Sequence, residues 1–357
     1  PACLKKTHLS QNVGAGLDPC AALQAPIPLT PDEKQEIVFM LGSALTAEEA
    51  VNLAKQVRGP EAATKALERV REFWGNLLGA VQVKTPDPAF DVMFNGWLLY
   101  QSLSSRIWGR SGYYQSGGAF GYRDQLQDAM NFVHASPQLL REHILLCASR
   151  QFLEGDVQHW WHPPQGRGVR TRCSDDYLWL PMAVCRYVLC TGDMDILDEK
   201  VPFLEGAPLA EGQESVYDHP RVSDQTQSLY DHCVRALSNG LPRGDNGLPL
   251  MWFGDWNDGM NLIGQHGKGE SVWLSIAWIR ACKMLIRIAR LSGHDADADA
   301  LEPVLKQMNR AVDARGWDGE WYLTAIDDEG RDIGSRENEE GKIFMIPQLW
   351  AVLADLD

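Results

Sequence analysis

The chain has 357 residues, with 33 Lys and Arg against 48 Asp and Glu, so its formal net charge is −15. This acidic balance argues against nucleic acid, anionic membrane surfaces and polyphosphate as main partners. Hydrophobic residues make up 45% of the chain and charged residues 23%, which is typical of a folded globular protein. The 13 tryptophans fit either a sugar-lined cleft or the core of a large helical domain.

The eight cysteines form no C-x-x-C pair and show no spacing typical of a zinc site or a disulfide framework. We therefore predict free cysteines, a reducing compartment and no bound metal. The chain begins without a signal peptide, and no stretch is apolar enough to span a bilayer. Because it lacks an initial Met and stops, at Asp357, within an expected helix, we expect it to be an internal piece of a longer protein.

The first part of the chain predicts strands followed by helices. Apolar runs at 27–29 and 36–41 predict strands within residues 1–45. A capping box at 46–49 opens a helix, and a second helix follows it after a Gly-Pro pair. We therefore expect a helical linker over residues 46–84.

From residue 85 to residue 357 nearly every segment has the 3.6-residue apolar period of a helix. The expected helices cover 88–109, 124–134, 137–153, 175–191, 224–238, 271–292 and 296–314. Long connections rich in Gly and Trp separate them, at 110–123, 154–174, 239–270 and 317–347. Apolar β-branched strands do not alternate with these helices, which argues against a parallel sheet. Helical hairpins whose long connections meet at one end favour an α/α barrel with its site in those loops.

Three loop motifs carry candidate chemistry, and the first, at 111–128, contains Arg123 and Asp124. Adjacent Arg and Asp side chains can make charge-assisted, directional hydrogen bonds to vicinal sugar hydroxyls. The motif is rich in glycine, but no Gly-Lys-Ser/Thr follows, so it is not a phosphate loop. The alternative is an internal ion pair, with Asp124 as the N-cap of the next helix.

The second motif joins His159-Trp-Trp-His162 to a later acidic pair that begins at Asp175. Aromatic rings such as that of Trp161, with acidic groups such as Asp175 nearby, would bracket a sugar. The alternative is ordinary packing, with Asp175 capping the helix that follows. A metal site is disfavoured, because no acidic or Cys ligand is placed to complete it and two prolines follow the second histidine.

The third motif runs from Trp252 to Asn261 and contains Asp255, Trp256 and Asp258. Two carboxylates flanked by indoles in a Gly-rich loop suit a general acid, because burial against an indole raises the pKa of a carboxyl group. Two alternatives remain: a calcium-type loop, since Asp and Asn side chains are oxygen ligands, and a simple Asx turn.

At these motifs the chain resembles glycoside hydrolase family 94, the inverting phosphorylases of β-glucosides. The resemblance rests on Gly-Tyr-Arg-Asp-Gln-Leu-Gln-Asp at 121–128, Gly-Asp-Trp-Asn-Asp-Gly-Met-Asn at 254–261 and Asn-Glu-Glu-Gly-Lys-Ile-Phe at 338–344. The stretches at 154–164 and 171–181 are similar to the phosphorylase-like domain of cyclic β-1,2-glucan synthases and to β-1,2-oligoglucan phosphorylases. The resemblance covers essentially the whole chain.

The resemblance implies a mainly α fold in three parts. It implies the end of a β-sandwich over 1–45, a helical linker over 46–84 and, over 85–357, an (α/α)6 catalytic barrel that is incomplete at its C-terminal end. The family's phosphate-binding His lies beyond the last residue of this chain.

The resemblance also implies the roles of single residues. The family's general acid falls on Asp258, and its sugar-binding positions in the donor subsite fall on Arg123, Asp124 and Trp256. We add three residues of the motifs as candidate sugar contacts: Asp255, Trp161 and Asp175. The small run at 116–119 stands where the cellobiose and chitobiose branches carry a basic residue, which argues against a β-1,4 disaccharide.

The expected function is inverting phosphorolysis of a β-glucan, most simply β-1,2-linked, or the reverse synthesis. Inorganic phosphate is the co-substrate, no cofactor is expected, and a homodimer is one open assembly. The expected location is the cytoplasm or the cytoplasmic face of the inner membrane. One rival is an inverting hydrolase on the same fold, with Glu270, Asp175 or Glu337 as its second carboxylate. The other is a catalytically silent glucan-binding module that limits chain length in a synthase.

Overall fold

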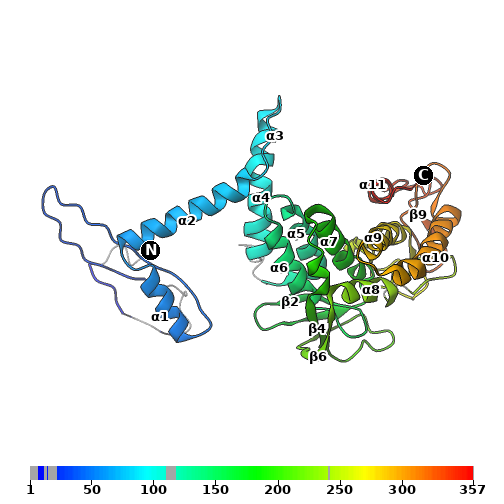
Figure 1. Cartoon of the computed structure of the whole chain (residues 1–357), viewed down its shortest axis with the longest axis horizontal. Coiled ribbons are helices and arrows are strands. Elements are labelled where there is room, and N and C mark those ends of the chain that lie inside the picture. Colours follow the sequence, from blue (N-terminus) through cyan, green and yellow to red (C-terminus); the bar gives the residue numbers. More distant parts are fainter. Residues whose placement is uncertain (1–6, 12–13, 15–21, 110–117, 240–241, 357) are drawn as a thin grey trace. The chain divides into compact units, whose positions relative to one another are not determined.

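Figure 1 shows the computed structural model of the chain, which is mainly helical, as predicted. The structure describes residues 7–11, 14, 22–109, 118–239 and 242–356. The chain divides into two compact units, Pro1–Gly75 and Asn76–Asp357.

The first unit contains helix α1 (Ala47–Gln56) and most of helix α2 (Pro60–Gly79). The predicted capping box is confirmed: the Glu49 amide donates to Thr46 Oγ1 (3.2 Å), and the Thr46 amide donates to Glu49 Oε2 (3.3 Å). The strands predicted at 27–29 and 36–41 are wrong for this structure, because the described part of residues 1–45 forms no strand. A strand is stable only beside hydrogen-bonded neighbours, and these two segments are mostly exposed.

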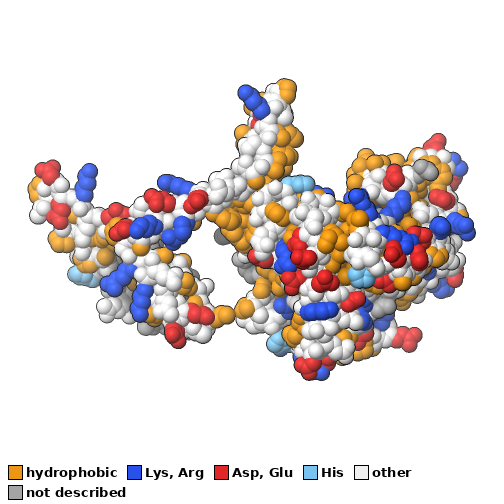
Figure 2. Space-filling view, in the orientation of Figure 1, with side chains coloured by type: hydrophobic (Ala, Val, Ile, Leu, Met, Phe, Trp, Pro, Cys, Tyr) orange, Lys and Arg blue, Asp and Glu red, His pale blue; other side chains and the backbone are white. Residues whose placement is uncertain are grey.

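The second unit opens with the helix predicted at 88–109, which forms as one continuous run of helical backbone. Asp87 caps it, because its Oδ1 accepts the Ala89 amide (2.9 Å). Within the run, α-helical pieces alternate with π-helical turns: α3 (Pro88–Val92), η2 (Met93–Trp97), α4 (Leu98–Gln101) and η3 (Ser102–Trp108). Many of its apolar side chains are exposed, although Leu103 is fully buried, and Figure 2 shows hydrophobic side chains gathered along the segment that carries α3.

The remaining helices pack in two rows. Successive contacts join α5 to α7, α7 to α9 and α9 to α11, whereas α6, α8 and α10 pack against these helices from outside that row. The bounds are α5 (Tyr122–Ala129), α6 (Pro137–Ala148), α7 (Asp176–Thr191), α8 (Leu229–Asn239), α9 (Val272–Leu291), α10 (Asp295–Ala311) and α11 (Met345–Leu353). Alternation between two rows is the packing that an α/α barrel requires. The closed six-hairpin barrel stays a prediction.

Three predicted helices have clearly different bounds in the structure. The helix expected at 124–134 ends at Ala129, the helix expected at 137–153 ends at Ala148, and the helix expected at 224–238 begins only at Leu229. The residues before Leu229 form strand β6, because they hydrogen-bond to β4 rather than to their own chain neighbours.

Short antiparallel strands occupy connections that were expected to be loops. One sheet has the order β1-β2-β3-β5, a second pairs β4 with β6, and a third has the order β7-β8-β9. The bounds are β1 (Phe120–Gly121), β2 (Gln158–His162), β3 (Arg167–Thr171), β4 (Lys200–Glu205), β5 (Ser215–Asp218), β6 (Arg221–Ser228), β7 (Glu270–Ser271), β8 (Ala325–Ile326) and β9 (Asp332–Ile333). These strands give the loop ends of the helices a fixed shape.

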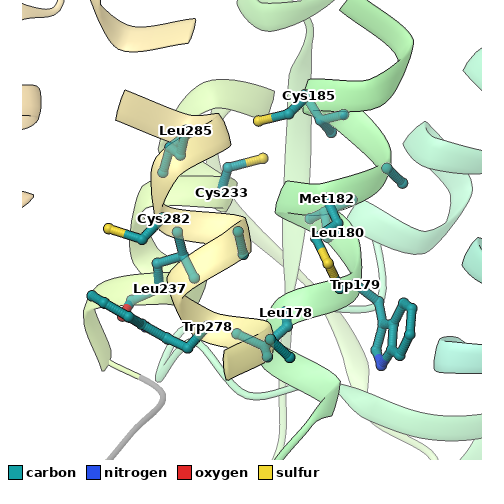
Figure 3. Close-up of a cluster of buried hydrophobic side chains, with 14 of the residues drawn as sticks. Leu178, Trp179, Leu180, Met182, Cys185, Cys233, Leu237, Trp278, Cys282 and Leu285 are labelled. Atoms are coloured by element: carbon teal, nitrogen blue, oxygen red, sulfur yellow. The ribbon is translucent and has the colours of Figure 1, made fainter. Parts of the chain in front are cut away.

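The core is centred on α7 and α9, which have neighbours on both sides and are apolar around most of their surface. Figure 3 shows side chains of α7, α8 and α9 around Cys185, Cys233 and Cys282. All six cysteines in the described part of the chain are free, and all but Cys190 are buried. The prediction of free cysteines is confirmed for these six, and the five buried ones pack as small hydrophobic residues.

The last described helix, α11, ends at Leu353, so the helix expected to run to the end of the sequence does not continue through residues 354–356, and Asp357 lies outside the described residues. The backbone turns at Asp355, whose φ is +53°, and the Lys283 ammonium donates to the carbonyls of Ala354 (2.7 Å) and Asp355 (2.9 Å). None of the described helices is long and apolar enough to cross a membrane.

Candidate active site

Arg123 brings the first and third motifs together. It lies in the first turn of α5, directly after β1, and its side chain is only 9% exposed. Its Nη2 donates to both carboxylate oxygens of Asp258, at 2.9 and 3.2 Å, and its Nη1 donates to the Asp255 carbonyl (3.4 Å). Burial lowers the pKa of Arg123, but its acidic neighbours, Asp175 first, raise it above the ordinary value, so it stays a cation.

Asp175, from the second motif, supports Arg123 from the buried side. Its Oδ1 lies 3.5 Å from Arg123 Nη1, and its Oδ2 accepts the indole N–H of Trp179 (2.9 Å). The side chain is fully buried, and burial together with the neighbouring Asp176 charge raises its pKa. Asp175 occupies the N-cap position of α7 but makes no side-chain capping bond, so the capping alternative is wrong.

The loop of the third motif is anchored by Asp255. Its Oδ1 accepts the Asn257 amide (2.9 Å), and its Oδ2 accepts the Ser271 hydroxyl (2.7 Å). The residue is 3% exposed, and burial raises its pKa. Gly254 precedes it with φ +136°, a conformation that favours glycine, and its carbonyl accepts both the amide and the hydroxyl of Ser174 (3.0 Å each). The loop is therefore fixed to the start of α7.

Asp258 has different surroundings from Asp255. It opens a short 3₁₀ turn, η6 (Asp258–Met260), for which the Asn257 side chain is the N-cap. Its side chain is 77% exposed. We expected a general acid that is buried against an indole, and this is wrong for Asp258 in this structure. The turn leaves its carboxylate exposed to solvent while it contacts the buried Arg123 side chain. The predicted Asx turn is present at Asn257, and both oxygens of Asp255 are already bonded within the protein.

Trp256 lies two residues before Asp258, and Asp124 directly follows Arg123. The Trp256 indole N–H donates to Gln127 Oε1 on α5 (3.2 Å), and the residue is 37% exposed. The Asp124 carboxylate lies 3.6 Å from Arg106 Nη2 in a partly exposed pair, whereas Arg123 pairs with Asp175 and Asp258, so the predicted internal ion pair does not form between Arg123 and Asp124. Asp124 does not cap α5, whose N-cap, Gly121, has no side chain.

Three of the proposed sugar contacts face the protein interior. Trp161 is fully buried in the core, with the Phe120 ring centroid 5.9 Å away and the Arg150 guanidinium 5.2 Å from its ring. Asp175 and Asp255 are also buried, and their oxygens bond to protein groups. Trp161 is a core residue in this structure, and the sugar contacts predicted for Asp175 and Asp255 stay predictions for two buried side chains. The neighbouring Trp160, unlike Trp161, is partly exposed.

His159 forms a second ion pair behind the site. Its Nδ1 lies 2.8 Å from Asp176 Oδ2. Burial lowers the pKa of His159, but the charge and hydrogen bond of Asp176 raise it to about 9. Donor atoms of His159, Cys173 and Asp176 lie within 4.8 Å of one another, as in a metal site. The expectation that no acidic or Cys side chain is placed to join a histidine here is therefore wrong, because Cys173 and Asp176 both lie beside His159.

The structure thus defines a mainly α-helical domain whose loops gather a guanidinium, an exposed carboxylate and an indole, groups that suit sugar hydroxyls and sugar ring faces. Comparison with known proteins identifies the family. The catalytic-domain model of the glycosyl hydrolase 94 superfamily matches residues 73–356, and the supersandwich-domain model of glycosyl hydrolase 94 matches residues 1–60. The chain belongs to glycosyl hydrolase family 94.

Curated relatives include both synthases and phosphorylases. The chain is 42% identical, over 99% of its length, to the cyclic β-(1,2)-glucan synthase NdvB of Rhizobium meliloti, of which it covers 12%. It is 31% identical to the solabiose phosphorylase of Paenibacillus borealis over its whole length and 43% of that protein. It is 28% identical to the 3-O-β-D-glucopyranosyl-β-D-glucuronide phosphorylase of Paenibacillus borealis, over its whole length and 44% of that protein. The chain thus spans less than half the length of each of these relatives.

Proposed function

We propose that this chain supplies catalytic residues to an enzyme that cleaves β-glucosidic bonds by inverting phosphorolysis, releasing α-glucose 1-phosphate, or that runs the reverse reaction. The observation that carries the proposal is the exposed Asp258 carboxylate, which accepts two hydrogen bonds from Arg123. The identity of 42% to a protein named cyclic β-(1,2)-glucan synthase supports β-1,2-glucan as the substrate. Phosphate is the co-substrate, and the reaction needs no cofactor.

Asp258 is the proposed general acid. In an inverting cleavage one carboxylic acid protonates the leaving oxygen while the nucleophile attacks the opposite face of the sugar ring. Phosphate is already an anion and needs no base to activate it. In this structure Arg123 Nη2 donates to both carboxylate oxygens of Asp258. Sugar hydroxyls that accept the N–H groups of Arg123 would replace this contact, and Asp258 would then take a proton from solvent and donate it to the leaving oxygen.

The rival hydrolase needs a second, free carboxylate to activate water. Glu270 is 1% exposed, and its Oε1 accepts the amides of Asn246 and Leu248 (3.1 Å each). Asp175 is engaged by Arg123 and Trp179. The Glu337 side chain is 83% exposed and lies 3.5 Å from Arg336. The engagement of Glu270 and Asp175 supports phosphorolysis over hydrolysis.

A phosphate-dependence assay separates the proposed function from both rivals. The naturally expressed protein is incubated with β-1,2-gluco-oligosaccharides, with and without inorganic phosphate, and glucose 1-phosphate and free sugars are measured. We expect α-glucose 1-phosphate that requires added phosphate. Phosphate-independent release of glucose would identify the hydrolase, and glucan binding without turnover would identify the silent module. Parallel assays with β-1,3- and β-1,4-linked disaccharides test the linkage.

We also propose that the reaction takes place in the cytoplasm or at the cytoplasmic face of the inner membrane. The six free cysteines in the described part of the chain support a reducing compartment. Fractionation of the source cells, followed by detection of the protein, tests this location.

A further inference from the structure

The four-stranded sheet beside the site carries a cluster of aromatic side chains on one face. Trp160 and His162 lie two residues apart on β2, so they point to the same side of the sheet, and Tyr217 lies on β5. The ring centroids of Trp160 and Tyr217 are 5.6 Å apart, and those of Trp160 and His162 are 5.3 Å apart. We name these three side chains the aromatic face. Tyr217 is 51% exposed, and Trp160 and His162 are partly exposed.

The strand register connects the aromatic face to the candidate active site. Gly121 of β1 pairs with Trp160, Trp160 pairs with Val169 of β3, and Val169 pairs with Tyr217. Directly paired residues project from the same side of a sheet. The four residues therefore form one row that spans three inter-strand steps, about 14 Å.

Asp124 lies at one end of this row. A Cβ atom added to Gly121 would be 2.4 Å from Asp124 Oδ2, so the carboxylate occupies the space where Gly121 has no side chain. That space is on the Trp160 side of the sheet, because Gly121 and Trp160 are paired. Asp124 and the aromatic face are thus continuous on one surface, and Asp124 directly follows Arg123.

The chemistry of the aromatic face suits a carbohydrate chain. Indole and phenol rings stack on the C–H-rich faces of sugar rings, and polar groups at their edges can bond to hydroxyls. Arg167, whose guanidinium carbon is 5.9 Å from the Tyr217 ring centroid, supplies such donors. Three aromatic side chains present at most about 750 Å² even when fully exposed, and these are partly covered. A stable protein interface needs about 800 Å² on each partner, so a partner protein fits less well.

We propose that the aromatic face binds the glucan residues that extend away from the bond being cleaved, so that it sets the preference for long chains over disaccharides. This inference rests on the proposed function, since it places a longer stretch of the same glucan beside the same site. Neither Trp160 nor Tyr217 touches the groups proposed to carry the chemistry.

The test compares chain lengths in Tyr217→Ala, Trp160→Ala and the matched control Tyr217→Phe, which keeps the ring. In the naturally expressed protein we expect Tyr217→Ala to raise KM for long β-1,2-glucan by about tenfold and to change kcat/KM for a β-1,2-linked disaccharide by less than about twofold. Tyr217→Phe should behave like the unaltered protein. Because Tyr217 is half exposed, its variants should fold even if those of Trp160 do not.

Binding of long β-1,2-glucan, measured by retardation in glucan-containing gels, tests the inference without turnover. Weaker retardation of Tyr217→Ala, with Tyr217→Phe unchanged, supports it. Unchanged length dependence and unchanged retardation would overturn it, as would a change in oligomeric state without a change in glucan binding. If the protein turned over no glucan but Tyr217→Ala still weakened retardation, the proposed function would be wrong, and glucan binding by the aromatic face would be supported.

Discussion

Asp255 and Asp258 lie three residues apart in one loop, but their surroundings predict different effects of the same substitution. Asp258 is exposed and contacts Arg123, whereas Asp255 is buried and accepts hydrogen bonds from Asn257 and Ser271. An asparagine at position 258 keeps the shape of the side chain but cannot deliver a proton. We expect Asp258→Asn to lower kcat for phosphorolysis of a natural β-glucan by about 10²–10⁴-fold, with little change in unfolding. Steady-state kinetics and thermal unfolding measure the two effects.

Asp255→Asn is the matched control for this experiment. An amide at position 255 cannot accept at both of its ends, so one buried hydrogen bond is lost at a cost of about 1–3 kcal/mol of unfolding free energy.

A glucosyl fluoride donor, whose leaving group needs little protonation, should restore much of the initial cleavage in Asp258→Asn. If Asp258→Asn stayed active while Asp255→Asn was dead, the roles within the pair would be reversed. If both variants kept activity, the loop would not hold the general acid.

The ion pair of His159 and Asp176 predicts a loss of stability at alkaline pH. The pKa of His159 is raised to about 9 in the folded chain, against 6.5 for the free side chain, because Asp176 outweighs the effect of burial. The stabilising charge is fully present below about pH 6.5 and is lost as pH rises through 9. We expect the free energy of unfolding to fall by about 3 kcal/mol between pH 6.5 and 9.5 through this group.

Urea unfolding at a series of pH values measures this effect, with His159→Gln as the comparison. The variant should show a flatter alkaline slope. His143 and His232, whose pKa values burial lowers to about 4, change charge on the acid side. The buried cysteines, whose pKa values burial raises, add the same alkaline slope to both proteins, so the difference between the two slopes measures His159. Parallel slopes in the variant and the unaltered chain would show that His159 carries no charge in the folded state.

The two adjacent tryptophans show what single residues of the site reveal from sequence alone. The Trp-Trp pair predicts aromatic contact with sugar, but in a strand only one of two neighbours can face outward. Which one faces outward depends on the pairing of β2 with β1 and β3, and the sequence of residues 110–123 does not predict a strand. The sequence alone therefore does not tell the two apart, whereas the structure places Trp161 in the core and Trp160 at the surface.

At the scale of elements, the junction of β1 with α5 positions Asp124 through a missing side chain. The space beside Gly121 is filled by the Asp124 carboxylate, and a methyl group there would be 2.4 Å from Asp124 Oδ2. The carboxylate can rotate away, so Gly121→Ala should change the unfolding free energy by no more than about 1 kcal/mol. It should raise KM for glucan, because Asp124 moves. Unchanged KM in a folded Gly121→Ala would remove Asp124 from the proposed sugar contacts.

Helices were predicted better than strands, for physical reasons. The helices have long apolar periods and local start signals, such as the capping box at 46–49 and the Gly-Pro pair whose proline opens α2, and both are present in the structure. The strands are two to eight residues long, and β1 pairs with a segment about forty residues away. Their sequences lack the apolar alternation of a half-buried strand, and part of β6 lies in a segment that the sequence predicts as a helix.

The motifs of the candidate site were found from sequence, but their mutual geometry was not. Arg123 and Asp258 are 135 residues apart, and only the packing of α5 against the loop before α9 brings them together. The sequence also predicted that the general acid is a buried carboxyl group. In this loop the carboxyl group whose pKa burial raises is that of Asp255, not that of the proposed acid. The fold also brings two cationic side chains, Arg123 and His159, next to four carboxylates, which belong to Asp175, Asp176, Asp255 and Asp258.

At the scale of the whole molecule, the second unit has apolar helix faces that no other described residue covers. Val92 is 71% exposed and Trp97 is 50% exposed on the first helical run, and Met345 and Val352 on α11 are 66% and 78% exposed. Exposed apolar surface of this extent favours association with other proteins or other parts of a longer chain. In two-row helical packing, the first and last helices are the ones that have a neighbour on one side only.

We therefore expect the 357-residue chain, produced by itself, to self-associate in a concentration-dependent way and to lack phosphorolytic activity. Light scattering coupled to size-exclusion chromatography measures the association. Val92→Glu combined with Val352→Glu should reduce it, because each change places a charge on an apolar face, whereas both residues are too exposed for the fold to depend on them. Val222→Glu, on β6 with a side chain 64% exposed, is the matched control and should leave association unchanged. A monodisperse and active 357-residue chain would show that these helix faces need no further cover.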